Sequence, residues 1–437
     1  MAKRPGFFSA VFISLFLASN SFASPDANRE TGAAQDAEKV RTALTEALDS
    51  SNSPDSRCRA ITLLGSSRDV EVKKAMAGLA ADPEVQVCAT RVMGEQRNEF
   101  SEELLVRNVE DYLNAAGSKG PFEDNLKKRL SAINSIWALG ELGNPQLMDK
   151  LFSFYDSADD IIKVNLIIGM GKLKDNSKAA PYLYSIAGDP RETEIVRATA
   201  FEILEKTGSP ARLDNLVPSK KVGAQKGDIF WTGGVIGSIF SSLSPDMPIG
   251  HPGIFAGTKT EDGRIKLVIS DCVPDYFVPP GVRIVHSWYY FTHHYKYPYY
   301  GNRTSKTRPT PSQRNAIANL VLKMGTQGLR YDNLHLSQKG PKFDCVGYAE
   351  HIYERVGLDP TDSSYETGMG WPLTPYEQFD SLVANAESDM VEQVPGGMTT
   401  PSNKAPFQTV KRFAESFGQT DVSEPEISLE TAPEPVN

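Results

Sequence analysis

The chain has 437 residues, of which 23% are charged and 40% are hydrophobic, and its formal net charge at pH 7 is −9. This length and hydrophobic content suit two folded domains with cores of their own. The acidic balance argues against nucleic acid as a partner, because the phosphate backbone is bound through clusters of Lys and Arg.

The N-terminus has the pattern of a secretory signal peptide over residues 1–23. The basic pair Lys3-Arg4 precedes an apolar run over 7–18, and Ser21-Phe22-Ala23 fits a small-residue cleavage site. The run is too short to span a bilayer, and no later stretch approaches the roughly 20 apolar residues of a spanning helix. We therefore predict an exported protein, periplasmic or secreted, with no transmembrane segment and with a linker over 24–35.

Residues 36–218 are expected to be helical and internally repetitive. Four segments place apolar residues at helical spacing and end at Gly65, Gly94, Gly140 and Gly171. A period of about 30 residues is typical of stacked helix pairs. The region loosely resembles HEAT-like α-solenoid repeats, whose concave surface would bind a protein or a cell-wall polymer. A rigid spacer that presents the second domain is an equally open interpretation.

Four cysteines in an exported chain can form disulfides. Cys58 and Cys88 hold matching positions in two of the repeats, so neighbouring helices would bring them together. Cys272 and Cys345 are the other possible pair, and a bond between them would remove a free thiol. The sequence leaves this pairing open.

After residue 218 the composition shifts to Gly, aromatic and β-branched residues, which is typical of strands. We expect an α+β domain over 222–390. Segments 250–257 and 264–272, joined by a polar hairpin at 261–263, predict two strands of one antiparallel sheet. An aromatic run over 288–300 either lines a groove or covers the edge of the sheet.

Residues 344–357 predict a helix with both ends marked. Asp344 is a good N-cap, and Gly357 suits the left-handed residue that closes a helix. Cys345 falls in the first turn, where free N–H groups and the helix dipole stabilise an anion, so a thiol there ionises more easily. The competing interpretation is a small buried hydrophobic residue, the commonest role of a free cysteine.

This helix and the residues before it resemble NlpC-type cysteine peptidases, in which a Tyr precedes a Phe-Asp-Cys-x-Gly nucleophile helix. Here Tyr331 is followed by Phe343-Asp344-Cys345-Val346-Gly347, and Val346 stands where the family usually has Ser. His251, in His-Pro-Gly-Ile-Phe-Ala-Gly, precedes the cysteine. That order is similar to the circularly permuted papain-like group, which includes lecithin:retinol acyltransferase-like proteins. The resemblance covers about residues 223–375.

The resemblance implies a catalytic triad. His251 would take the proton of Cys345, and the thiolate would attack a carbonyl to form a thioester. Asp271 is our choice for the polar residue that holds the imidazole. Ser270 is its rival, because a shift of one residue reverses the face of a strand. Tyr331 is expected to contact the substrate or the oxyanion.

The triad predicts an exported amidase or endopeptidase that cuts peptide bonds, those of peptidoglycan among them. A lipid acyltransferase, thioesterase or lipase is the alternative, favoured by the apolar stretch 235–243, and a non-enzymatic interaction protein is the third hypothesis. No cofactor is expected, and no metal either, since His293 and His294 have no carboxylate or cysteine at ligand spacing beside them. Residues 391–437 predict an acidic, largely disordered tail.

Overall fold

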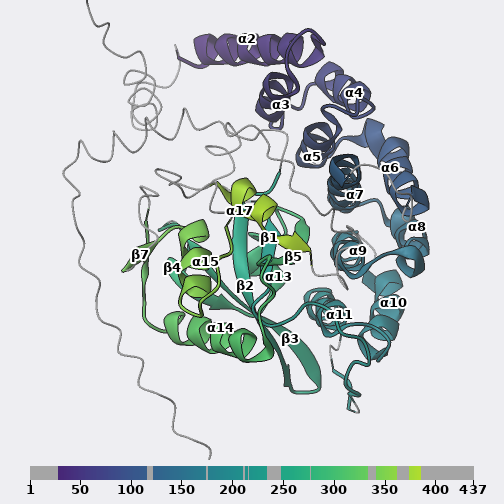
Figure 1. Ribbon diagram of the computed structural model, residues 1–437. Coiled ribbons are helices and arrows are strands. Elements are labelled where there is room, and N and C mark those ends of the chain that lie inside the picture. Colours follow the sequence, from purple (N-terminus) through teal and green to yellow (C-terminus); the bar gives the residue numbers. More distant parts are fainter. Residues whose placement is uncertain are drawn as a thin grey trace, which may run out of the picture.

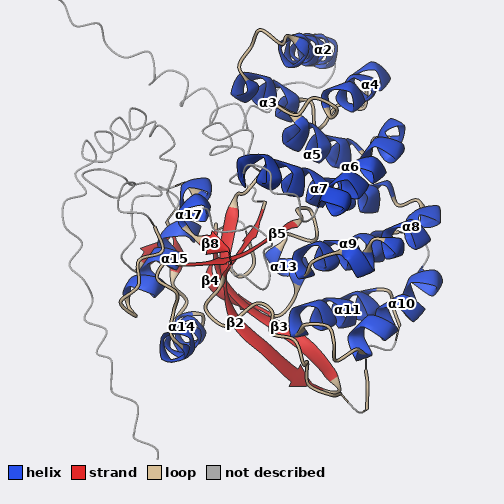
Figure 2. Cartoon of the chain, turned by 45° about the vertical axis from the view of Figure 1, so that its right-hand side comes forward, coloured by secondary structure: helices blue, strands red, loops and turns tan. Residues whose placement is uncertain are grey.

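The computed structural model describes residues 28–115, 122–173, 176–209, 212–214, 216–233, 248–275, 277–332, 341–361 and 374–384. These residues form helices and an antiparallel sheet (Figures 1 and 2). The predicted signal peptide, the apolar stretch 235–243 and the tail 391–437 lie outside the described residues, whereas the first helix begins at Asn28, inside the predicted linker. None of the described helices is both long and apolar enough to cross a membrane.

The N-terminal helices stack in chain order along an arc, which we call the helical array (Figure 1). Helices α3, α5, α7, α9 and α11 pack successively against one another as an inner layer, and α4, α6, α8 and α10 lie outside them. The bounds are α2 Asn28–Leu48, α3 Pro54–Leu63, α4 Val70–Leu79, α5 Gln86–Gln96, α6 Glu102–Ala115, α7 Phe122–Leu142, α8 Met148–Ser153, α9 Asp160–Lys172, α10 Asn176–Gly188 and α11 Glu194–Lys206, with short 3-10 helices at Glu99–Ser101, Pro145–Leu147 and Tyr155–Ser157.

Three of the four repeat glycines lie inside the last turns of their helices and do not end them as the sequence predicted. They are packing positions. A Cβ on Gly140 of α7 would lie 3.0 Å from the Cα of Gly169 in α9, and one on Gly94 of α5 would lie 2.3 Å from the ring of Trp137. Any larger residue would push these inner helices apart, which explains a glycine at these positions better than a helix end does.

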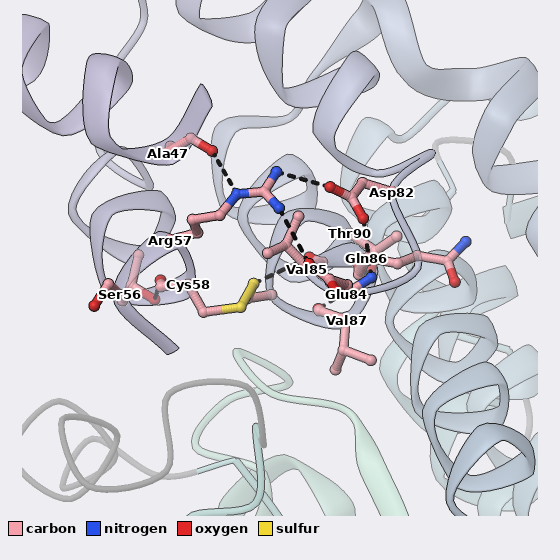
Figure 3. The surroundings of a disulfide bond; sticks show 12 residues. Ala47, Ser56, Arg57, Cys58, Asp82, Glu84, Val85, Gln86, Val87 and Thr90 are labelled. Atoms are coloured by element: carbon pink, nitrogen blue, oxygen red, sulfur yellow. Dashed lines mark hydrogen bonds and ion pairs between the residues drawn. A yellow bond between two sulfur atoms is a disulfide. The ribbon is translucent and has the colours of Figure 1, made fainter. Parts of the chain in front are cut away.

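A disulfide joins the first inner helices. Cys58 of α3 and Cys88 of α5 are bonded, with their Cα atoms 5.7 Å apart, which confirms the first of the two possible pairings. Beside it the buried guanidinium of Arg57 donates to the carbonyl of Ala47 at 3.1 Å and pairs with Asp82 at 2.7 Å (Figure 3). The disulfide joins α3 to α5, the hydrogen bond joins α3 to α2, and the ion pair joins α3 to the loop before α5.

We expect the double substitution Cys58→Ala and Cys88→Ala to lower the free energy of unfolding by about 2–4 kcal/mol, because the bond restricts the unfolded chain. Urea denaturation of both proteins, each with and without reductant, measures this. Reductant should shift the midpoint of the natural chain and leave that of the double variant where it is. Identical midpoints for the oxidised and the reduced natural chain would contradict the prediction.

The C-terminal half contains a sheet of strand order β4-β3-β2-β1-β5-β8, in which every pairing is antiparallel. The predicted hairpin is present: Asp262 and Gly263 have φ of 52° and 71°, as a tight turn between β2 and β3 requires. The bounds are β1 Ile229–Thr232, β2 His251–Glu261, β3 Arg264–Val273, β4 Gly281–Val285, β5 Tyr299–Thr304 and β8 Val383–Ala384, with α13 Trp288–Phe291, α14 Pro311–Met324, α15 Cys345–Glu354, α17 Pro375–Ser381 and a separate parallel pair, β6 Arg330–Tyr331 and β7 Lys342–Phe343.

The sheet is covered on both faces (Figure 2). Trp231 of β1 packs edge-on against Phe379 of α17, with ring centroids 5.5 Å apart. The face of the sheet to which Trp231 points is covered by α14, α15 and α17, and we call it the α15 face. Its neighbour Phe230 points to the opposite face and stacks on Trp288, with ring centroids 5.7 Å apart. Trp288 donates a hydrogen bond to Thr199 of α11 at 2.8 Å, so this face meets the helical array, and we call it the array face. The concave side of the array from α7 to α11 is thus filled by the chain's own sheet (Figure 1).

Candidate active site

Cys345 begins α15, as the N-cap pattern predicted. The side chain of Asp344 accepts the backbone N–H of Gly347 at 2.6 Å and holds the first turn. The thiol is buried. Burial raises the pKa of the Cys345 thiol far above its usual range, the carboxylate of Asp344 raises it further, and the nearby hydroxyl of Tyr331 offsets this only in part. The thiol therefore stays protonated at neutral pH, whereas reactive cysteines lie in partly exposed, electropositive surroundings.

Helix α15 packs against the α15 face through polar as well as apolar contacts. The hydroxyl of Tyr348 lies 2.7 Å from the hydroxyl of Ser270 on β3. Two residues further along the same strand, the thiol of Cys272 donates to the carbonyl of Phe343 at 3.2 Å, and both Cys272 and Cys345 are free thiols. Ser270 and Cys272 thus point to the side of the sheet on which Cys345 lies.

His251 and Asp271 meet on the array face. Nε2 of His251 lies 3.0 Å from Oδ2 of Asp271. Arg283, opposite Asp271 on β4, donates to both carboxylate oxygens at 2.8 and 3.0 Å. Burial by itself would raise the pKa of Asp271, but Arg283 and the hydrogen bond from His251 hold it well below its ordinary value. Asp271 is therefore ionised, and Nε2 of His251 carries the proton that bonds to it.

The predicted triad is divided between the two faces of the sheet. Ser270 and Asp271 are neighbours in β3, so their side chains point in opposite directions: one to α15, the other to His251. The structure brings His251 together with Asp271, and Cys345 together with Tyr331. It does not bring these two pairs together, and no hydrogen bond between described residues joins His251 to Cys345. The prediction that Cys345 shares one site with His251 is wrong, because the sheet separates them.

The aromatic run up to Tyr295 lies between the sheet and the array and not along a sheet edge, and its last two residues belong to β5. Within it, His293, His294 and Tyr295 adopt left-handed backbone conformations, with φ of 52°, 65° and 57°. Non-glycine residues rarely do so, and a structure that keeps them must hold them in place. Two array residues do this: Trp137 of α7 and Lys172 of α9 donate to the carbonyl of Tyr295 at 3.0 and 2.8 Å.

Glu202 of α11 makes four hydrogen bonds to the sheet half. Its buried carboxylate accepts the hydroxyl of Ser287 at 2.7 Å, the backbone N–H groups of Trp288 and Tyr289 at 2.8 and 2.9 Å, and the hydroxyl of Tyr295 at 2.5 Å. Burial raises the pKa of Glu202, and these hydrogen bonds offset the shift in part. A side chain of the array therefore caps helix α13 of the sheet half.

Sequence reasoning missed three residues of this region: Arg283, Glu202 and the role of His293. The ring of His293 lies 5.3 Å from that of His251, centroid to centroid. Burial lowers the pKa of His293 to about 3, and His251 acts in the same direction. No local pattern reveals these residues, since each meets its partner through the fold.

Comparisons with known proteins leave the assignment to geometry. A scan against protein-family models finds no matching model, and searches of curated proteins and of solved structures find no match. In the part of the chain that the structure describes, no three or more His, Cys, Asp or Glu side chains are grouped to hold a metal ion. The function of the chain must therefore follow from its own side chains on the two faces of the sheet.

Proposed function

We propose that the chain is an exported interaction protein, built from HEAT-like repeats and a permuted papain-like domain that lacks an assembled catalytic pair. The observation that carries this proposal is the position of Cys345 and His251 on opposite faces of one sheet. A thiol nucleophile needs an imidazole within hydrogen-bond reach to take its proton. Moving His251 to the other face would require a new register for β2, which would move every side chain of that buried strand to the opposite face of the sheet.

The partner of such a protein would bind the part of the array that the sheet leaves uncovered. The sheet contacts α7, α9 and α11, and helices α2 to α4 extend beyond it (Figure 1). Two large apolar side chains are exposed near the turn between α3 and α4: Leu63 is 70% exposed and Val70 is 47% exposed. A protein or a cell-wall polymer bound there would use the array as the sequence interpretation expected.

Thiol labelling tests the proposal. In the folded, oxidised protein we expect Cys345 to react with iodoacetamide no faster than Cys272, because both thiols are buried and protonated and become accessible only on unfolding. His251→Ala should leave the labelling rate of Cys345 unchanged within about twofold once the rate is corrected for the stability of the variant. Mass spectrometry of the digested protein over a time course measures both cysteines in one sample.

The opposite outcome would establish an enzyme. Rapid labelling of Cys345 that His251→Ala abolishes would show that the imidazole activates the sulfur. Hydrolysis of muropeptides that is lost in Cys345→Ala would then identify an amidase or endopeptidase, and hydrolysis of phospholipid esters a lipid acyltransferase, thioesterase or lipase. Ser270→Ala is the matched control, since Ser270 contacts α15 through Tyr348 and not through the sulfur.

A further inference from the structure

Two imidazoles come together where the sheet meets the array. The rings of His251 and His293 have centroids 5.3 Å apart and planes tilted by 48°. His251 is 2% exposed and His293 is 8% exposed. Nδ1 of His293 is buried and makes no hydrogen bond to any described residue. A buried polar atom without a partner is costly, and a bound ligand at this atom would remove that cost.

The environment of His251 is the one that metal-binding histidines have. Its Nε2 donates to Asp271, whose negative charge is held by Arg283. A carboxylate bonded to one ring nitrogen fixes the tautomer, orients the ring and raises the basicity of the other nitrogen. With the Nε2 proton directed at Asp271, Nδ1 is the ring nitrogen that can offer a lone pair, and no described residue forms a hydrogen bond with it.

His293 supplies a second neutral imidazole. Its Nδ1 is buried and has no hydrogen-bond partner among the described residues, and metal ions bind a ring nitrogen that carries a free lone pair. The left-handed turn that carries it is held by the array, so its ring is positioned before any ligand arrives.

We propose that His251 and His293 together bind one transition-metal ion of the zinc or copper type, with solvent in the remaining positions. At a metal–nitrogen distance of about 2.1 Å, two imidazoles at a tetrahedral angle have ring centroids roughly 5 Å apart. The observed 5.3 Å matches that separation. No third His, Cys, Asp or Glu of the described chain completes the set, so the affinity is below that of a structural zinc site.

The expectation from sequence that His293 belongs to no metal site rested on the residues next to it in the chain. The proposed partner, His251, is on a distant strand and reaches His293 only through the fold. His294, the immediate neighbour, is exposed and stacks on Tyr289 at 4.3 Å, so it has no part in the site.

Zinc titration of the full chain, free of any histidine tag and treated with chelator beforehand, tests the proposal. Competition with a chromophoric chelator should give one Zn²⁺ per chain, and Co²⁺ bound at the same site should show an absorption spectrum with nitrogen ligands. His293→Asn should weaken zinc binding at least tenfold, and Asp271→Asn about tenfold to a hundredfold. Asn is chosen at position 293 because it tolerates positive φ better than other non-glycine residues.

His294→Asn is the matched control, since it changes an exposed histidine of the same turn and should leave the affinity unchanged within about twofold. Absence of binding at submillimolar zinc overturns the proposal. So does full affinity in His293→Asn with an unaltered circular dichroism spectrum, or an equal loss in His294→Asn. These outcomes are independent of thiol labelling, so the metal site and the interaction function can fail separately.

Discussion

Replacing Arg283 with Met is expected to lower the free energy of unfolding by about 3–5 kcal/mol at pH 7, because it leaves the ionised Asp271 buried without its cation. Asp271 is fully buried and Arg283 nearly so, and two hydrogen bonds join them. Urea denaturation measures the loss. Removing the charge as well, in a double variant with Asp271→Asn, should recover part of it.

The effect of Arg283→Met should depend on pH with a known sign. The pKa of Asp271 is depressed in the folded chain and near 3.9 in an unfolded one, so the pairing stabilises the fold above about pH 4 and its contribution is lost as the pH falls. In the variant the carboxyl protonates more easily. The gap between the natural chain and the variant should therefore be widest near neutral pH and narrow below pH 4.

Arg264→Met is the control for this prediction. Arg264 pairs with Glu205 at 3.0 Å near the surface, where a salt bridge contributes about 1 kcal/mol or less. A loss of that size in Arg283→Met as well, or a gap that does not narrow as the pH falls below 4, would show that the Asp271 pairing is not the cause.

Glu202→Ala is expected to cost about 3–5 kcal/mol and to loosen the contact between the array and the sheet. The substitution removes the acceptor of two hydroxyls and two backbone N–H groups, and a buried donor left without a partner costs about 1–3 kcal/mol. It also releases Tyr295, the last residue of the left-handed turn. Hydrogen exchange over residues 287–297, together with urea denaturation, measures both effects.

Glu205→Ala is the matched control on the same helix. Its side chain is 59% exposed and pairs only with Arg264 among the described residues, so exchange over 287–297 should not change. Glu202→Ala would count against the proposed contact if it unfolds at the urea concentration of the natural chain, or if it leaves exchange over 287–297 unaltered.

Arg283 and Glu202 show that the two halves of the chain share one buried polar region. Arg283 and Asp271 belong to the sheet, whereas Glu202, Trp137 and Lys172 belong to the array and hold the turn that carries His293. The concave side of the array is thus a structural partner of the sheet. This arrangement leaves one end of the array exposed, where we propose that a partner binds. It also brings together the two imidazoles that we propose bind a metal ion.

Local chemistry by itself determined a good part of this protein. The helices predicted within residues 36–218, the turn at Asp262-Gly263 and the N-cap at Asp344 follow from short-range patterns, and the structure has the turn, the N-cap and helices as far as Lys206. The pairing of Cys58 with Cys88 also followed, because the two residues hold matching positions in similar helical segments and those helices, α3 and α5, lie side by side.

Only the tertiary structure decided what Cys345 and His251 could do. Side chains alternate along a strand, so a single residue separates Ser270, which faces α15, from Asp271, which faces the array. The order of residues in a motif does not show which face of a strand each side chain occupies. It does not show the distant contacts of His293 either. Which groups share a site was determined by the packing of whole layers on the two faces of the sheet.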